Sequence, residues 1–418
     1  MDSILSSVRA ILRKAWPYAP VGYALIIGVH QVSLVNSSKL DRDVMTYMAL
    51  ATRFDALSLV GGAREPVWPG LLAVPTHLFG AQPWIPRLLG VAAFGFLVLA
   101  TEVLVAKRHG LRWATAAGWV LAASPWLIFQ SARGLREEAA AGLIIIFAAG
   151  VVSGRLSTRR AGVLAVLAGL AGMLRWDTVI VTLPTLLLFM VVTRADFRQW
   201  ALALLVFGLI VAPLLVGNAV MYDDPFYHSN IHARFFRNLE FRGQPGFLTS
   251  AQVARNSFGG PPITWPEYIF GLHTTKQIVG RSVEGFENVP RRNAGLLAFY
   301  PSTPSLDAWP TLNIFANNET IVAWTLPALA VVGAITVLRG PAWPLAMMLP
   351  LSMGIYPFIS GLMDYRLAMN EIPLMIVLDI EALVMLGPLV RSPLKRIIGE
   401  QQGVNTVEVT LQTEPRRS

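Results

Sequence analysis

The chain has 418 residues and a formal net charge of +9; 54% of its residues are hydrophobic and only 14% are charged. An ordinary soluble domain has about 25% charged residues, so this composition excludes a single soluble domain and a disordered chain and indicates several membrane spans. There is no cysteine, which excludes disulfides and thiolate chemistry. We attribute the positive charge to loops that face anionic lipid and expect no nucleic-acid partner.

The first apolar run, 16–35, follows a basic N-terminal stretch. It is too long for a signal peptide, so we predict a transmembrane helix there. Nine further runs follow, and the expected fold is an all-α polytopic membrane protein with about ten transmembrane helices. The predicted spans are 16–35, 84–106, 113–129, 139–152, 161–174, 178–192, 200–220, 321–338, 343–359 and 367–389.

Basic residues mark alternate loops of this arrangement. Because cytoplasmic loops are enriched in lysine and arginine, these loops predict the cytoplasmic side, with both termini there and the protein in a bacterial plasma (inner) membrane. They contain Lys107, Arg155, Arg194, Arg339 and Lys395. The apolar segment 67–79 is too short for a span, and counting it would place the Lys107 loop outside. We therefore predict a helix that lies at the outer interface.

Two segments on the predicted outer side are long. The first spans 36–83 and contains the acids considered below. The second, 221–318, has a mixed composition and is the expected outer cap, with a short helix over 266–279. The predicted organisation is thus a transmembrane domain over 1–390 that carries both outer segments, followed by a polar cytoplasmic tail over 391–418.

The first outer segment opens with two acids, Asp41 and Asp43. Asp43, Tyr47 and Ala51 are spaced four residues apart, so on a helix they share one face. A solvated amphipathic loop with snorkelling charges is the alternative interpretation.

The order of these features resembles the GT-C superfamily of membrane glycosyltransferases, and in particular the branch with protein O-mannosyltransferases and the lipid A aminoarabinose transferase. In that branch an Asp-x-x-x-Tyr-x-x-x-Ala motif opens the first outer loop, a short interfacial helix ends in "LFG", and an arginine precedes the second span. Here these elements are Asp43-Tyr47-Ala51, segment 66–80, and Arg87 in "PRLLG". "SPWLIFQSARGLREEAAAGL", "MYDDPFY" and "GLMDYRLAMNEIPLM" resemble later family segments. The resemblance covers about 15–390, except the outer cap.

The resemblance implies an inverting glycosyltransferase. It would move a sugar from a polyprenyl-phosphate-linked donor to a hydroxyl of a glycan, lipid or protein acceptor on the outer membrane face. The acceptor hydroxyl must lose its proton as it attacks, which calls for a carboxylate general base. Asp43 is the first candidate. Asp41 is the second, because Val44 stands where family members usually have a glutamate.

Arginines at the predicted outer edge are candidates for binding the anionic phosphate of the donor. We assign this role to Arg87 and Arg366, with Arg133 and Arg175 as further candidates. The alternative is local pairing of arginines with acids nearby in sequence, namely Arg64–Glu65, Arg136–Glu137, Arg175–Asp177 and Arg366–Asp364. The predicted substrate-binding residues are Tyr47, Arg64, Glu65, Asp224 and His228.

His228 and His232 are four residues apart, and Asp223 or Asp224 could complete a metal site with them. We favour substrate contacts or surface histidines instead. No cofactor or metal ligand is assigned, and a requirement for a divalent metal is left open.

The alternative function is a polytopic lipid or solute transporter, or flippase, without transferase chemistry. Such proteins place charged residues or broken helices near the bilayer midplane. In this sequence the charges gather at the predicted outer rim, which favours the transferase.

Overall fold

The computed structural model describes residues 16–34, 40–55, 58, 64–152, 156–298, 319–353 and 370–388. Within these ranges every regular element is a helix, and no strand occurs. The elements up to the cap are η1 (Trp16–Tyr18), α2 (Ala19–Leu34), α3 (Arg42–Ala51), α4 (Val67–Phe79), α5 (Trp84–His109), α6 (Leu111–Ala122), α7 (Pro125–Ser131), α8 (Glu137–Val151), α9 (Thr158–Leu174), η3 (Trp176–Thr178), α10 (Val179–Val192) and α11 (Phe197–Tyr222). The remaining elements are α12 (Tyr227–Glu240), α13 (Ser250–Arg255), η4 (Glu267–Gly271), α14 (Thr275–Ala298), α15 (Glu319–Val337), α16 (Trp343–Met353) and a helix over 371–388.

The predicted apolar runs correspond to helices wherever the structure describes them, with one internal difference. The run 113–129 is two helices, α6 and α7, which meet at Ser124 and Pro125. Proline has no backbone N–H and its ring obstructs the preceding turn, so it favours the start of a new helix. Ser124 caps this start, because its hydroxyl accepts a hydrogen bond from the Leu127 backbone N–H at 3.4 Å.

The predicted helix over 266–279 is also divided. It consists of η4 and the first turn of α14. Between them, Thr274 and Gln277 form a reciprocal cap: the Gln277 backbone N–H donates to the Thr274 hydroxyl at 3.3 Å, and the Thr274 backbone N–H donates to the Gln277 side chain at 2.8 Å. A capping pair of this kind satisfies the free N–H groups of a new helix, so α14 begins here.

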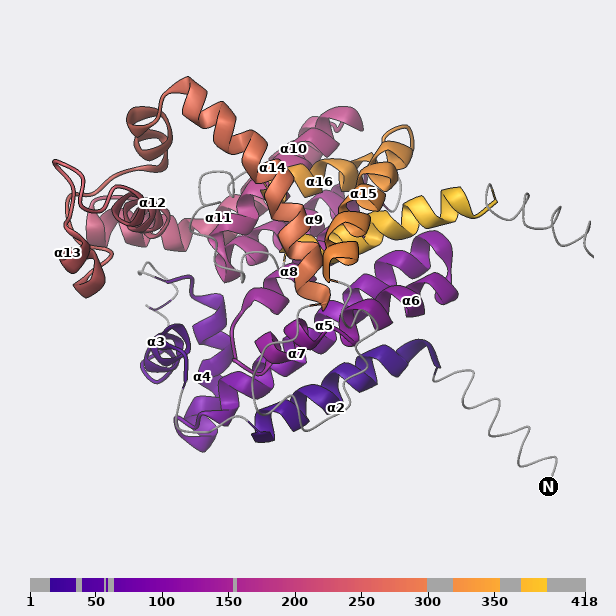
Figure 1. Ribbon diagram of the computed structural model, residues 1–418, viewed down its shortest axis with the longest axis horizontal. Coiled ribbons are helices and arrows are strands. Elements are labelled where there is room, and N and C mark those ends of the chain that lie inside the picture. Colours follow the sequence, from indigo (N-terminus) through magenta and orange to yellow (C-terminus); the bar gives the residue numbers. More distant parts are fainter. Residues whose placement is uncertain are drawn as a thin grey trace, which may run out of the picture.

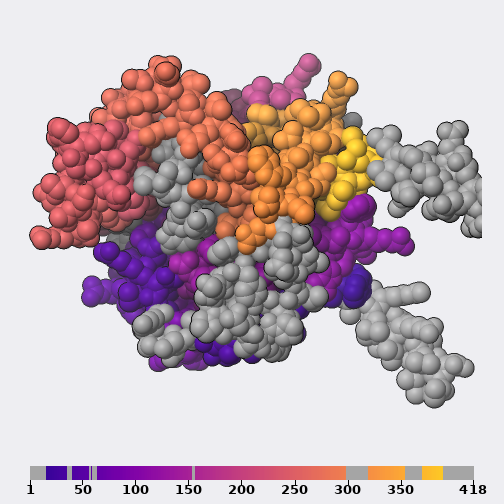
Figure 2. Space-filling view, in the orientation of Figure 1, coloured from indigo at the N-terminus to yellow at the C-terminus, as the bar shows by residue number. Residues whose placement is uncertain are grey.

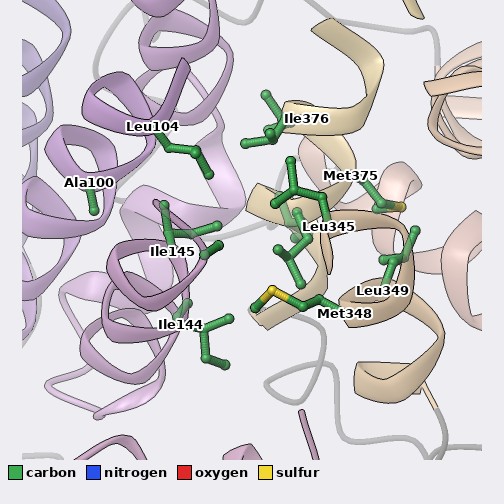
Figure 3. Packing of buried hydrophobic residues seen from close by; sticks show 14 of the residues in the cluster. Ala100, Leu104, Ile144, Ile145, Leu345, Met348, Leu349, Met375 and Ile376 are labelled. Carbon is green, nitrogen blue, oxygen red and sulfur yellow. The ribbon is translucent and has the colours of Figure 1, made fainter. Parts of the chain in front are cut away.

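The main hydrophobic core is built around α5, which packs against α2, α6 and α8. Figure 3 shows the part of this core where α5 and α8 meet the C-terminal helices, α16 and 371–388. The labelled residues there are Ala100, Leu104, Ile144, Ile145, Leu345, Met348, Leu349, Met375 and Ile376. The C-terminal helices are therefore part of the same packed bundle as the N-terminal half.

The last helix of the expected outer cap, α14, extends into this bundle. Val289, Ala294 and Leu297 are at most 1% exposed and belong to the main core. The helix packs along α15 and touches α7. In Figure 1, α14 runs from the α12–α13 region to the centre of the molecule. The cap is thus anchored to the bundle through one continuous helix.

Among the residues that the structure describes, three helices are long and apolar enough to cross a membrane, namely α5, α11 and α15. Of these, α5 is largely buried inside the bundle, whereas α11 and α15 are largely exposed. The other apolar helices are shorter than the ~20 residues of a perpendicular span. The count of ten spans therefore remains a prediction.

Successive helices run back and forth, so alternate connections meet at the same end of the bundle. Segments 40–55, 64–66, 131–137, 174–178 and 223–228 meet at one end of the bundle, which we call the site end. At the opposite end the C-terminus of α5 contacts helix 371–388, where His109 Nε2 lies 3.0 Å from Glu381 Oε1. In Figure 1, α3, α4 and α12 lie at the left, and helix 371–388 runs to the right.

Candidate functional site

Helix α3 presents the predicted motif at the site end. Tyr47 and Ala51 are at most 2% exposed, and with Asp43 they occupy one helical face. Asp43 lies in the first turn, where a negative charge complements the helix dipole. Asp41 is the residue before the helix, and its side chain makes no capping hydrogen bond. The helical spacing of the motif is confirmed, while the catalytic role of its acids stays a prediction.

Each of the two acids pairs with an arginine from a different part of the chain. Arg133 donates from Nε and Nη2 to both oxygens of Asp41, at 2.7 and 3.0 Å, and from Nη1 to Gln130 at 2.7 Å. Arg64 donates from Nη2 to Oδ1 of Asp43 at 2.8 Å. The expected alternative of an Arg64–Glu65 pair is therefore wrong. Both acids remain partly exposed, with 35% and 26% of their side chains accessible.

Glu65 is buried at the centre of the cluster, and its side chain is 2% exposed. Its carboxylate accepts hydrogen bonds from Arg136, from the backbone N–H of Trp176 at 2.9 Å, and from His228 Nε2 at 2.9 Å. Although burial raises the pKa of Glu65, the charges of Arg136 and His228 and their hydrogen bonds hold it well below its usual range. Glu65 is thus a carboxylate at every physiological pH. The sequence alternative that paired Arg136 with Glu137 is wrong, because Arg136 pairs with Glu65.

Tyr47 lies between two guanidinium groups. The Arg136 guanidinium is 5.3 Å from the centre of its ring, and that of Arg64 is 5.6 Å from it. Both distances are in the range of cation–π attraction. Burial raises the pKa of Tyr47 to about 12, while the two arginines oppose that rise. Tyr47 therefore stays neutral and contacts both arginines through its ring. Because Tyr47 is buried, the substrate contact predicted for it has little accessible surface.

Arg87, in the first turn of α5, is 3% exposed and within electrostatic range of Asp41. The connection that carries Arg133 lies directly against it. A Cβ at Gly134 would come within 2.9 Å of the Arg87 backbone nitrogen, and Gly134 has a left-handed φ of +82°. Only glycine tolerates both conditions. This tight approach brings the predicted phosphate-binding residues Arg87 and Arg133 to the same end of the bundle.

The other two predicted phosphate-binding residues have different outcomes. Arg175 is 4% exposed and its Nη2 lies 2.8 Å from Oδ2 of Asp177, so the local pairing expected for it is confirmed. It lies beside the cluster, because Arg136 donates to the backbone carbonyl of the preceding residue, Leu174, at 3.0 Å. Arg366 is outside the described residues.

In the cap, His228 and His232 lie on one face of α12, with ring centroids 4.9 Å apart. His228 is directed to Glu65, and His232 Nδ1 donates to the His228 carbonyl at 2.9 Å. Asp224 accepts from Asn230 at 2.8 Å and from the Phe226 backbone N–H at 2.9 Å. Asp224 is therefore held against the start of α12, and nothing in the described structure links it to Asp41 or Asp43. In the part of the chain that the structure describes, no three histidine or acidic side chains form a metal-binding group.

Sequence reasoning assigned no site role to two residues of this cluster. Arg136 joins Glu65 to Tyr47, and Glu138 is fully buried with no hydrogen bond to either carboxylate oxygen. Glu138 lies within electrostatic range of Arg133 and Arg175. The signal in the sequence was a run of three charges, Arg136 to Glu138, immediately before an apolar helix.

Comparison with known proteins was made at the level of sequence and of structure. No protein-family model and no curated protein sequence matches the chain. The structure is similar to that of the oligosaccharyltransferase of Archaeoglobus fulgidus in its apo form, with a TM-score of 0.52 and 14% identity over 92% of this chain and 52% of that chain. The chain has the GT-C fold. The predicted resemblance is thereby confirmed for the fold, and the chain spans about half the length of the archaeal enzyme.

Two further structures show lower similarity. The oligosaccharyltransferase AglB of Archaeoglobus fulgidus, in complex with an inhibitory peptide and a dolichol-phosphate, matches with a TM-score of 0.48 and 14% identity over 97% of this chain and 53% of that chain. ArnT of Cupriavidus metallidurans, bound to undecaprenyl phosphate, matches with a TM-score of 0.44 and 15% identity over 88% of this chain and 77% of that chain.

Proposed function

We propose that the protein is a glycosyltransferase that moves a sugar from a polyprenyl-phosphate-linked donor to an acceptor hydroxyl on the outer membrane face, with inversion at the sugar carbon. The observation that carries the proposal is the convergence of two partly exposed aspartates and several arginines at one end of a GT-C bundle. Acceptor deprotonation needs a carboxylate, and a leaving lipid phosphate needs cationic donors. The site end supplies both.

In the proposed reaction Asp43 is the general base. Arg133 engages both oxygens of Asp41, whereas Arg64 engages Asp43 through Oδ1. A carboxylate chelated on both oxygens by a guanidinium group is a poor proton acceptor, which argues against Asp41 as the base. Asp43 would accept the proton of the acceptor hydroxyl, the acceptor oxygen would bond to the anomeric carbon, and the bond from that carbon to the phosphate oxygen would break.

The proposed phosphate ligands are Arg87, Arg133 and Arg366, with Arg175 beside them. Planar guanidinium groups meet two phosphate oxygens at once, which suits a leaving group whose negative charge grows in the transition state. The described members of this set lie at the same end of the bundle as Asp43. Arg64 and Asp224 are the remaining proposed substrate contacts, whereas the buried Tyr47 would act by holding Arg64. We place the site end on the outer face of a bacterial plasma membrane.

The test is a transfer assay with the purified full-length protein. Radiolabelled polyprenyl-phosphate sugars are supplied in detergent with glycan, lipid and peptide acceptors, and the label on each acceptor is counted. The proposal expects acceptor labelling from at least one donor, with release of unlabelled lipid phosphate. The transporter alternative predicts something different: movement of intact labelled lipid across a proteoliposome bilayer, with no label on any acceptor.

A further inference from the structure

The outer cap is joined to the first outer segment by one buried contact. His228 lies in the first turn of α12, and its Nε2 donates to Oε1 of Glu65 at 2.9 Å. The two side chains are only 4% and 2% exposed. In Figure 2 the red surface of the cap lies beside the indigo surface of the N-terminal segments at the site end. This contact fixes α12 to the part of the chain that precedes α4.

Glu65 also binds segments of the chain other than α12. Its carboxylate also accepts from Arg136, which precedes α8, and from the backbone N–H of Trp176, which follows α9. Four separate segments therefore meet on one carboxylate. When a buried carboxylate loses one such donor, its charge is stabilised by fewer hydrogen bonds in a place that water does not reach, which costs the fold more than the loss of an exposed pair.

From Glu65 the contacts continue to Asp43. Arg136 faces the ring of Tyr47 at 5.3 Å, and Arg64 faces the same ring at 5.6 Å while donating to Asp43 at 2.8 Å. Tyr47 and Asp43 are four residues apart on α3, so the ring and the carboxylate project from the same face. The path from the cap to the proposed base thus runs through side chains that contact one another in turn, namely His228, Glu65, Arg136, Tyr47, Arg64 and Asp43.

We infer that Glu65 and His228 are positioning residues of the transfer reaction, which dock the cap on the first outer segment and thereby fix the orientation of α3 and Asp43. The inference rests on the proposed function for its catalytic meaning, and it replaces the predicted role of these two residues in substrate binding. Their burial and their mutual contact leave them no surface for a substrate. A chain of contacts by itself does not demonstrate coupling, so the inference requires a direct measurement of α3 when α12 is released.

Hydrogen exchange measured by mass spectrometry provides that measurement without any substrate. In His228→Leu the donor to Glu65 is lost, and we expect exchange to become about tenfold faster in α3 as well as in α12, the size of one charge-assisted hydrogen bond. His228→Gln keeps a donor at nearly the position of Nε2 and should restore slow exchange in both helices. Ser229→Ala is the control in the same turn of α12, because Ser229 makes none of the contacts of the Glu65 cluster described above, and it should exchange as wild type does.

The outcomes separate coupling from simple loosening of the cap. Faster exchange in α12 with unchanged exchange in α3 would overturn the inference. If His228→Leu does not fold, two other variants take its place with the same expectations. These are Glu65→Gln and His228→Asn, whose side-chain N–H group is too short to reach Glu65.

In the transfer assay, His228→Leu should lower kcat about tenfold with little change in the KM for the lipid-phosphate sugar, and His228→Gln should recover kcat. A rise in KM alone would indicate substrate contact and contradict a positioning role. A wild-type protein that transfers no sugar would overturn the proposed function while leaving the exchange result intact.

Discussion

At the residue scale, the site is a set of charges paired across long distances in sequence. Arg133 and Asp41 are 92 residues apart, and Arg136 and Glu65 are 71 apart. Because the described arginines of the site end already interact with other groups of the protein, a bound phosphate would compete with these groups for guanidinium N–H donors. Arg133, for example, donates from Nε and Nη2 to Asp41 and from Nη1 to Gln130.

Substitution of Arg133 tests its proposed contact with the phosphate. Arg133→Gln removes the charge and the planar fork, so affinity for a polyprenyl phosphate should fall by a factor of about 10–100, equivalent to about 1.5–3 kcal/mol. Arg133→Lys keeps the charge without the fork and should lie between this variant and wild type. Binding is measured with a fluorescent polyprenyl phosphate. Wild-type affinity in Arg133→Gln would exclude a direct contact.

The sequence predicted which residues gather at the site end, and it did not predict their pairing. Asp41, Asp43, Arg87 and Arg133 were recognised because they stand in motifs at the predicted outer edge. Their partners could not be inferred, because a sequence shows neighbours along the chain and not neighbours between connections. Arg175 differs from the others, because its partner, Asp177, is only two residues away in the sequence and could therefore be named from the sequence.

At the element scale, the apolar runs of the sequence predicted where the helices lie. The structure differs from these predictions where a single polar or proline residue divides a run into two helices. Pro125 ends the run of α6, and Thr274 begins α14. The average hydrophobicity of a long segment does not show where one such residue ends a helix or begins another. The sequence likewise did not predict that the connection carrying Arg133 packs closely on α5, although this contact depends on Gly134.

Gly134 should be the most sensitive glycine of the site end. Gly134→Ala forces a left-handed φ of +82° on alanine and places its Cβ 2.7 Å from the Pro86 carbonyl carbon. Gly110→Ala is the control, because Gly110 has a similar φ of +85° in open space. Backbone strain alone costs about 1–2 kcal/mol, so Gly110→Ala should lower thermal stability modestly and Gly134→Ala clearly more. Equal midpoints in thermal unfolding would contradict the close packing of the Arg133 connection on α5.

The cap helices should loosen in acid because of one carboxylate. Burial raises the pKa of Glu240, but hydrogen bonds from Arg281, Tyr268 and His273 lower it below the ordinary value. A depressed folded-state pKa contributes stability that is present above the unfolded value of 4.5 and is lost as the pH falls through the folded value. Limited proteolysis of the cap should therefore accelerate below about pH 4.5. Glu240→Gln should be cleaved faster than wild type at pH 6, and its rate should depend less on pH in this window; an unchanged pH profile would contradict the assignment.

At the scale of the whole molecule, the sequence predicted that successive helices run in opposite directions across the bundle. Which end of the bundle faces the cytoplasm is a separate question. Basic residues at alternate loops predicted which connections share an end. The structure brings the C-terminus of α5 to helix 371–388, away from α3. The compartment that each end faces is set by charge bias during insertion into the membrane.

Cysteine labelling in this cysteine-free chain determines that direction. Ala254 is exposed on α13 in the cap, and Arg112 is exposed at the opposite end of the bundle. An impermeant maleimide applied to intact cells, or spheroplasts, should label Ala254→Cys. It should label Arg112→Cys only after lysis. The reverse pattern would place the site end in the cytoplasm and contradict the proposed outer-face reaction.

The central claim, that Asp43 is the base of a sugar transfer from a lipid phosphate, is tested most directly by single-turnover transfer in three matched variants. Asp43→Asn removes the proton acceptor with little change in volume, and transfer should fall about 10²–10⁴-fold while donor binding persists. Asp55→Asn is the control in the same segment, because Asp55 bonds to Ser58 and an asparagine oxygen can accept the same backbone N–H, and it should transfer at the wild-type rate. Asp41→Asn should lose less activity than Asp43→Asn. Wild-type transfer by Asp43→Asn, together with an inactive Asp41→Asn, would contradict the account and move the base to Asp41.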